Sequence, residues 1–223
     1  MSAKILIIDH NDSFTYNLVG LFESARDGRG NRLVAFVEVW PVDQLPAKDL
    51  EEIWRFDAIV LSPGPGLPKD YPAVFRLLKY CLKASGPMPV LGVCLGLQTL
   101  VTYFGGALYN LPRIQHGRQV DVYIESSNNA LALFEGLSVP LKAGLYHSWG
   151  MDTGIIVPGL EVLATARIPD IGARGEQAIP ARPVVMAVGH KSLPVCGLQF
   201  HPESYMTPEG SVIISNWLGM ATR

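Results

Sequence analysis

The stretch PVLGVCLGLQTL, residues 89–100, contains a cysteine between two glycines, at the point where an apolar run changes to helical periodicity. This pattern predicts a strand, a sharp turn and a helix. Gly92 and Gly96 lack the side chains that would keep the strand and the helix apart. We therefore expect Cys94 to project from a strained elbow between them.

The predicted position of Cys94 suits a nucleophile. The first amides of a helix have no partner within the helix, and its dipole favours a thiolate at that end. The N–H of Leu95 would point to the place where an oxyanion forms if Cys94 attacked a carbonyl. Gln98, one turn later on the same helix face, could hydrogen-bond the substrate. The alternative is that Cys94 belongs to the core, as free cysteines often do.

Composition excludes several classes of protein. The chain has 223 residues, 48% of them hydrophobic, and a formal net charge of −2. No long basic run is present, so we expect no nucleic-acid partner. No apolar segment reaches the roughly 18 residues of a membrane span, and no basic leader precedes the first strand, which predicts a cytoplasmic protein without a membrane partner. The three cysteines are too widely spaced for a disulfide framework or a zinc site.

The first half of the chain alternates strands and helices. Strands are expected at 4–9, 33–39, 57–62 and 88–93, and helices at 14–24 and 71–82. This order is typical of an open, mostly parallel sheet flanked by helices, whose sites lie at the carboxyl ends of the strands. Further strands at 119–124, 141–146, 161–166, 184–188 and 195–200 predict a mixed-sheet extension. An exposed loop at 168–183, a closing helix at 208–218 and one domain over residues 1–223 complete the expectation.

The sequence SPGPG, residues 62–66, follows a buried strand directly. Its glycines leave room for a ligand to approach the backbone, so a second oxyanion donor is plausible here. A glycine peptide rotates at little cost, and we expect Gly64–Gly66 to be the less rigid half of such a site. An ordinary Pro-Gly turn is the alternative. The segment lacks the lysine of a phosphate-binding loop.

The sequence QFHPES, residues 199–204, is predicted at the end of a strand and therefore at the same sheet edge as the elbow. Pro202 disfavours a helical conformation at His201, and in an extended segment His201 and Glu203 face the same way. His201 could then deprotonate Cys94 while Glu203 orients the imidazole. A purely structural turn is the alternative interpretation.

A third polar segment, YHSW at residues 146–149, also ends a predicted strand. Its backbone edge could hold the amino-acid part of a substrate. The remaining histidines, His10, His116 and His190, have no metal-ligand spacing, and we assign them to surface or local hydrogen-bonding roles.

Together these motifs resemble the class I, or triad, glutamine amidotransferases. The residues DSFTYNL at 12–18 narrow the resemblance to the glutaminase component of anthranilate synthase and aminodeoxychorismate synthase, and it extends over almost the whole chain. It implies a single α/β domain of the class I glutamine amidotransferase type. Two features depart from the usual pattern: Leu97 occupies a position that usually holds histidine, and His10-Asn11 replaces the usual Asn and variable residue.

The resemblance also implies a role for individual residues. Cys94 would be the nucleophile, His201 its base and Glu203 the partner that orients the base. Gly64 and Leu95 would supply the oxyanion hole. The other positions that match glutamine-binding positions of the family are Gly66, Gln98, Ser148 and Trp149.

We therefore expect a glutaminase subunit that hydrolyses L-glutamine through a cysteine thioester and delivers ammonia to a chorismate-using synthase subunit, in the tryptophan or the folate pathway. No metal or organic cofactor is expected for this half-reaction. A free-standing γ-glutamyl hydrolase or peptidase is one alternative, and a catalytically silent regulatory subunit is another. The complete set Cys94, His201 and Glu203 argues against the silent subunit.

Overall fold

A computed structural model describes residues 2–83, 86–151, 154, 157–168 and 183–222 of the chain. Its strands are β1 Ala3–Asp9, β2 Val34–Pro41, β3 Ala58–Leu61, β4 Val90–Val93, β5 Tyr109–Ile124, β6 Leu141–Gly150, β7 Leu160–Arg167, β8 Pro183–His190 and β9 Val195–Leu198. Its α-helices are α1 Thr15–Ser24, α2 Pro72–Cys81, α3 Leu95–Tyr103, α4 Asn128–Leu133 and α5 Gly210–Ala221. Short 3₁₀ turns occupy Leu45–Ala47, Leu50–Arg55 and Pro68–Asp70.

The described strands form one sheet in the order β2-β1-β3-β4-β9-β8-β7-β5-β6. The first five strands in this order, β2-β1-β3-β4-β9, pair in parallel, and the remaining pairings are antiparallel. The predicted parallel sheet with a mixed extension is therefore confirmed. Because the parallel strands end at one edge, the residues that follow β1, β3, β4 and β9 meet there.

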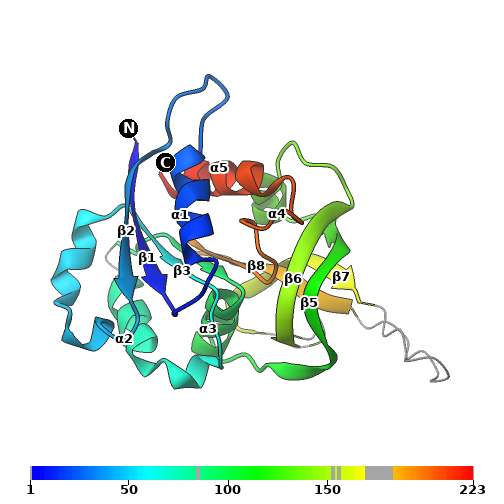
Figure 1. Cartoon of the computed structure of the whole chain (residues 1–223), viewed down its shortest axis with the longest axis horizontal. Coiled ribbons are helices and arrows are strands. Elements are labelled where there is room, and N and C mark those ends of the chain that lie inside the picture. The colour runs from blue at the N-terminus through cyan, green and yellow to red at the C-terminus, as the bar shows by residue number, and fades with distance from the viewer. Residues whose placement is uncertain (1, 84–85, 152–153, 155–156, 169–182, 223) are drawn as a thin grey trace.

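Helices cover both faces of the parallel part of the sheet (Figure 1). Alternate residues of β1 point to opposite faces, as the pleat of a strand requires. Ile5 and Ile7 pack with residues of α1 and α5, whereas Leu6 and Ile8 pack with residues of α2. The apolar run of β1 is continuous because both of its faces are buried.

Local sequence explains where α1 and α2 begin. The Asp12 carboxylate accepts the N–H of Phe14 at 2.7 Å, and Thr15 donates its hydroxyl to Asp9 at the end of β1 (2.7 Å). Pro72 is the first residue of α2, where the fixed φ of proline suits a helix start.

Several predicted boundaries are corrected. The strand predicted at 119–124 begins at Tyr109, the strand predicted at 141–146 continues to Gly150, and the strand predicted at 195–200 ends at Leu198. Helix α4 was not predicted. Most of the predicted loop at 168–183 lies outside the described residues. No helix within the described ranges has the length and apolar content to cross a membrane.

Candidate active site

The elbow predicted around Cys94 is present. Cys94 lies between β4 and α3 with φ 52° and ψ −103°, a backbone conformation that side chains disfavour. A Cβ on Gly92 would lie 2.4 Å from the carbonyl carbon of Gly96, and a Cβ on Gly96 would lie 2.3 Å from the Leu61 carbonyl oxygen. Only glycine fits at either position, so these two residues permit the close contact of strand and helix that forms the elbow.

His201 and Glu203 form a buried pair. The distance from His201 Nδ1 to Glu203 Oε1 is 2.7 Å, and both side chains are almost inaccessible to solvent. The backbone N–H of His201 donates to Gly144 of β6, and the Thr207 hydroxyl donates to the His201 carbonyl. The backbone bonds fix the segment against β6, and the bond to Glu203 holds the ring. His201 is therefore held through both its backbone and its side chain.

The pair forms for a different local reason from the one predicted. Strand β9 ends at Leu198, and residues 202–203 lie in a turn in which the N–H of Ser204 donates to the His201 carbonyl. The alternation of an extended strand therefore does not align His201 with Glu203. The turn brings the two side chains together instead.

His201 is electrostatically coupled to Cys94. Burial lowers the pKa of His201, but the Cys94 sulfur and the Glu203 carboxylate outweigh burial and raise the pKa to about 10. Nδ1 is hydrogen-bonded to Glu203, while Nε2 has no hydrogen bond to any described residue. Nε2 is therefore the ring nitrogen that can exchange a proton with the Cys94 sulfur. With this pKa the His201 imidazole is protonated at neutral pH.

Two buried glutamines connect Cys94 to the neighbouring strands. Gln98 donates its amide to the Trp149 carbonyl (3.1 Å) and to Gln199 Oε1 (3.3 Å). Gln199 Nε2 lies 3.7 Å from Cys94 Sγ. Gln98 therefore links α3 to β6 in this structure. The sequence analysis assigned no role to Gln199. Its position two residues before His201 could have indicated that it lies in the site.

The loop at residues 62–66 lies beside the elbow. A Cβ on Gly64 would lie 3.0 Å from Leu95 Cδ2, so the loop and the first turn of α3 are in contact. The N–H groups of Gly64 and Leu95 have no hydrogen-bond partner among the described residues. Gly66 lies farther along the loop, exposed, with φ +77°, and a Cβ on it would lie 2.8 Å from Asp70 Oδ2.

The segment 146–149 lies inside β6, which is the last strand of the sheet. Ser148 and Trp149 are half-buried, and the Trp149 carbonyl accepts bonds from Gln98 and from His147 Nδ1 (2.8 Å). The Tyr146 ring lies 4.9 Å from the His201 ring, and Phe14 lies 5.6 Å from it. The sequence did not predict this aromatic packing against His201.

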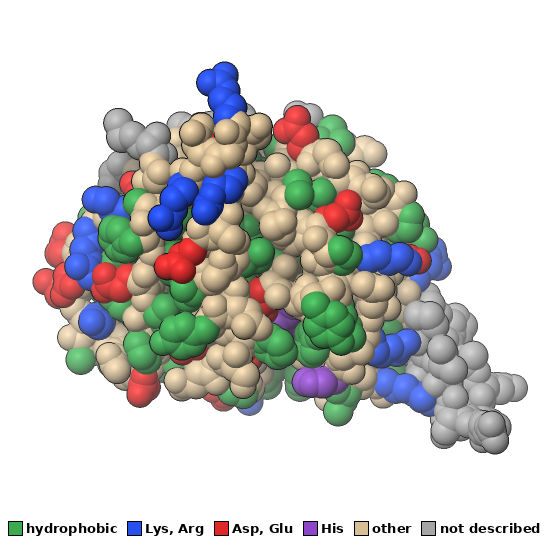
Figure 2. All heavy atoms as spheres, turned by 45° about the horizontal axis from the view of Figure 1, so that its top comes forward, with side chains coloured by type: hydrophobic (Ala, Val, Ile, Leu, Met, Phe, Trp, Pro, Cys, Tyr) green, Lys and Arg blue, Asp and Glu red, His purple; other side chains and the backbone are tan. Residues whose placement is uncertain are grey.

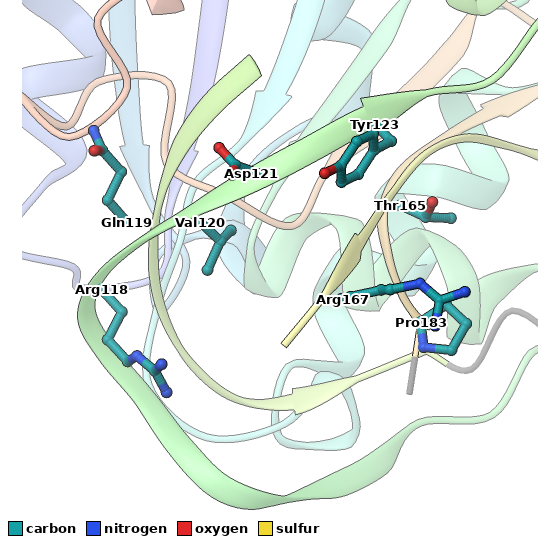
Figure 3. Close-up of a pocket in the computed structure, with 8 residues that line it drawn as sticks. All are labelled: Arg118, Gln119, Val120, Asp121, Tyr123, Thr165, Arg167 and Pro183. Carbon is teal, nitrogen blue, oxygen red and sulfur yellow. The ribbon is translucent and has the colours of Figure 1, made fainter. Parts of the chain in front are cut away.

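No cluster of three or more His, Cys, Asp or Glu in the described part of the chain has the geometry of a metal site. A cavity of about 590 Å³ is located elsewhere, on β5 and β7. Figure 3 shows Arg118 at one end of its lining and Arg167 with Pro183 at the other. None of the residues that line it is a predicted site residue, so the geometry around Cys94 identifies the candidate site and the cavity volume does not.

Comparison with known proteins agrees with this geometry. The model of the family described as "Glutamine amidotransferase class-I" matches residues 6–220. The chain belongs to the class I glutamine amidotransferase family. A Haemophilus influenzae protein named for anthranilate synthase component II is 39% identical over 220 residues, which cover 97% of this chain and 96% of the relative.

Two further similarities concern a second relative and the fold. The aminodeoxychorismate/anthranilate synthase component 2 of Bacillus subtilis is 33% identical over 96% of this chain and 95% of its own length. A crystal structure from Thermoplasma acidophilum, described as that of a GMP synthase subunit, superposes with a TM-score of 0.73. It is 21% identical and covers 100% of this chain and 95% of that one, and it confirms the predicted fold.

Proposed function

We propose that residues 1–223 form one glutaminase domain that hydrolyses L-glutamine at Cys94 and supplies ammonia to a chorismate-using synthase subunit. The observation that carries the proposal is the His201–Glu203 hydrogen bond of 2.7 Å, coupled to a cysteine at the start of a helix. Membership of the glutamine amidotransferase family supports the reaction class. The names of the relatives support a component of a chorismate-using synthase.

The first half-reaction consumes the carboxamide of glutamine. The Cys94 thiolate forms a C–S bond to the carboxamide carbon, and the electrons of the C=O bond move to oxygen. The N–H groups of Gly64 and Leu95, free of other partners among the described residues, are the proposed donors to that oxyanion. When the tetrahedral intermediate collapses, the C–N bond breaks and the leaving nitrogen takes the proton from His201.

The second half-reaction releases glutamate. His201, now neutral, accepts a proton from water as the water oxygen attacks the thioester carbon. The C–S bond breaks, the thiolate is restored, and the cycle consumes one water for each glutamine. Glu203 holds the imidazole through Nδ1 in both steps. The proposed contacts of the bound glutamine are Gly66, Gln98, Ser148 and Trp149.

The cytoplasmic location expected from the sequence stays a prediction.

The test separates ammonia release from ammonia use. In the complex with the synthase subunit, Cys94→Ala should abolish formation of the aminated product from chorismate and glutamine, and added ammonium should restore it. Cys81→Ala is the matched control, because Cys81 is buried in α2 away from the site. Loss of both activities in a folded Cys94→Ala complex would contradict the proposal. Product analysis separates the two pathways: anthranilate indicates tryptophan synthesis and aminodeoxychorismate indicates folate synthesis.

A further inference from the structure

The hydroxyl of Ser62 makes three contacts just after the end of β3. It lies 2.6 Å from the Pro63 carbonyl oxygen, 2.9 Å from the backbone nitrogen of His10 and 3.3 Å from His10 Nδ1. Both Ser62 and His10 are fully buried. A hydroxyl has one proton and two lone pairs. The Pro63 carbonyl can only accept, and it is the nearest partner, so Ser62 donates to it and accepts from the backbone N–H and the Nδ1–H of His10.

This arrangement fixes the orientation of the next peptide. In a trans peptide the C=O and the N–H point in opposite directions. The carbonyl of Pro63 is turned toward Ser62, so the N–H of Gly64 in the same peptide points away from Ser62. That N–H has no hydrogen-bond partner among the described residues and belongs to the residue in contact with Leu95.

His10 also lies directly against this peptide. A Cβ on Gly64 would lie 2.4 Å from His10 Cβ and 3.1 Å from the His10 carbonyl oxygen. The His10 and Tyr71 rings are nearly perpendicular, with their centroids 4.9 Å apart, and the Tyr71 hydroxyl donates to the Pro65 carbonyl at 2.8 Å. The loop is therefore held on both sides of Gly64, by Ser62 before it and by Tyr71 after it.

We propose that Ser62 and His10 are positioning residues of the glutaminase site, which hold the Pro63–Gly64 peptide with its N–H directed at the oxygen of the attacked carboxamide. This inference rests on the proposed function, in which Gly64 supplies that N–H. The oxyanion hole is then set by side chains before substrate binds. Neither residue touches the substrate; Ser62 acts through the peptide and His10 acts through Ser62.

The protonation of His10 agrees with this role. Burial lowers the pKa of His10 to about 4, although a hydrogen bond to the backbone of Ser62 and the charge of Asp9 act in the opposite direction. The imidazole is therefore neutral at neutral pH, with its proton on Nδ1 toward Ser62. Its Nε2 is buried without a hydrogen-bond partner in the described residues. The neutral ring thus gives Ser62 a donor and brings no charge next to the oxyanion.

The test uses Ser62→Ala, with Ser62→Thr as the variant that keeps the hydroxyl. Thr99→Val is the matched control: the Thr99 hydroxyl is fully buried close to the site and donates to the Leu95 carbonyl (2.8 Å), a bond that does not involve the Pro63–Gly64 peptide. Three measurements are made on the purified chain. These are kcat and KM for glutamine, the affinity for glutamate γ-semialdehyde, and the rate at which iodoacetamide alkylates Cys94.

The three measurements depend differently on the oxyanion hole. The aldehyde forms a thiohemiacetal whose oxygen occupies the hole, whereas alkylation by iodoacetamide needs only the sulfur. For Ser62→Ala we expect kcat to fall toward the ~10²-fold cost of one lost oxyanion donor, with KM little changed. Affinity for the aldehyde should fall in parallel, and the alkylation rate should stay the same. Ser62→Thr and Thr99→Val should both bind the aldehyde with the affinity of the wild type.

Two results would overturn the inference while leaving the proposed function intact. One is an unchanged kcat and aldehyde affinity in Ser62→Ala. The other is an equal fall in kcat, aldehyde affinity and alkylation rate, which would indicate a general loss of structure. A wild-type chain that releases no glutamate and binds no aldehyde, alone or with its synthase subunit, would overturn the proposed function itself.

Discussion

At the level of single residues, Cys94 combines the candidate chemistry with a strained backbone. Its φ of 52° and ψ of −103° cost a residue with a Cβ on the order of 1–3 kcal/mol. Bonds on both sides hold this conformation: the Cys94 N–H donates to Leu198, and the Cys94 carbonyl accepts from Gln98. The sheet and the helix therefore compensate the strain that exposes the sulfur to the site.

Strain at Cys94 predicts an unusual order of stability. Glycine ordinarily lowers stability by about 0.5–1 kcal/mol relative to alanine, but it adopts positive φ without strain. We therefore expect Cys94→Gly to be at least as stable as Cys94→Ala in urea unfolding. The control is Cys81, the last residue of α2, where alanine should be the more stable variant. Finding alanine the more stable residue at both positions would show that Cys94 is not strained.

Buried neutral histidines predict loss of stability in acid. Burial lowers the pKa of both His10 and His147 to about 4, against 6.5 for an exposed imidazole. Between these two pH values the unfolded chain binds protons that the folded chain does not. Stability should therefore fall as pH decreases from 6.5 to 4, by up to ~1.4 kcal/mol per pH unit for each imidazole.

Replacing His147 by glutamine tests this slope. His147→Gln keeps a donor for the Trp149 carbonyl and removes one titrating group. The pH dependence of its free energy of unfolding, measured in urea between pH 6.5 and 4, should be shallower than that of the wild type. Carboxylates titrate alike in both proteins and cancel in the comparison. Identical slopes would mean that folding does not lower the pKa of His147, so that the folded and unfolded chains bind its proton equally well.

At the level of elements, the site depends on the contact of α3 with β3 and β4. A Cβ on Gly96 would lie 2.3 Å from the Leu61 carbonyl oxygen, so Gly96→Ala must separate helix and strand. We expect a loss of roughly 1–3 kcal/mol or more and a displaced elbow with little glutaminase activity. Thermal unfolding and glutamate release measure the two effects.

Gly20 provides the control for Gly96. It lies exposed within α1, and a Cβ there would meet no atom within 4 Å. Gly20→Ala should raise stability by about 0.5–1 kcal/mol, because alanine favours the helix, and should leave activity unchanged. Equal effects of the two substitutions would argue against a tightly packed elbow.

The elements that sequence predicted best are those with strong local patterns. Strand β1 and helix α2 were predicted within one residue at each end, because apolar runs and an initial proline define them locally. Helix α4 has only six residues, and the first half of β5 carries polar residues and Pro112 without strict alternation. Neither segment has the periodicity on which prediction depends.

Contacts between distant segments could not be predicted in the same way. The elbow was found because its two glycines flank the cysteine in sequence. Ser62 and His10 are 52 positions apart, and Gln199 and Cys94 are 105 apart. Only the sheet order brings such pairs together. For this reason the glycine-rich loop was expected to be the less rigid half of the oxyanion hole, whereas Ser62 and Tyr71 hold it in the structure.

At the level of the whole molecule, exposed apolar residues lie next to the candidate site. Tyr16, Ile114 and Tyr205 are exposed at 72%, 70% and 84%. Each is within two residues of a side chain that contacts Tyr146 or His201: Phe14, His116 and Ser204, respectively. Figure 2 shows hydrophobic side chains on either side of exposed histidine atoms in the lower part of the view. We expect a synthase subunit to bind here, beside the site at which ammonia would be released.

This surface predicts coupling between the chain and its proposed partner. The isolated chain should hydrolyse glutamine slowly, and the complex faster, because a bound synthase subunit would exclude water from the site and so strengthen the electrostatic interactions within it. Tyr205→Ser should lower glutamine-dependent product formation, because it should weaken binding of the synthase subunit. Neither ammonium-dependent synthesis nor glutamate release by the isolated variant should change.

Leu131→Ser on α4 is the control, since Leu131 is also exposed (59%) but lies away from the sheet edge that carries the site. An isolated chain that already works at the full rate of the complex would favour a free-standing hydrolase over a coupled subunit. A Tyr205→Ser variant that binds the partner like the wild type would show that this surface is not the interface.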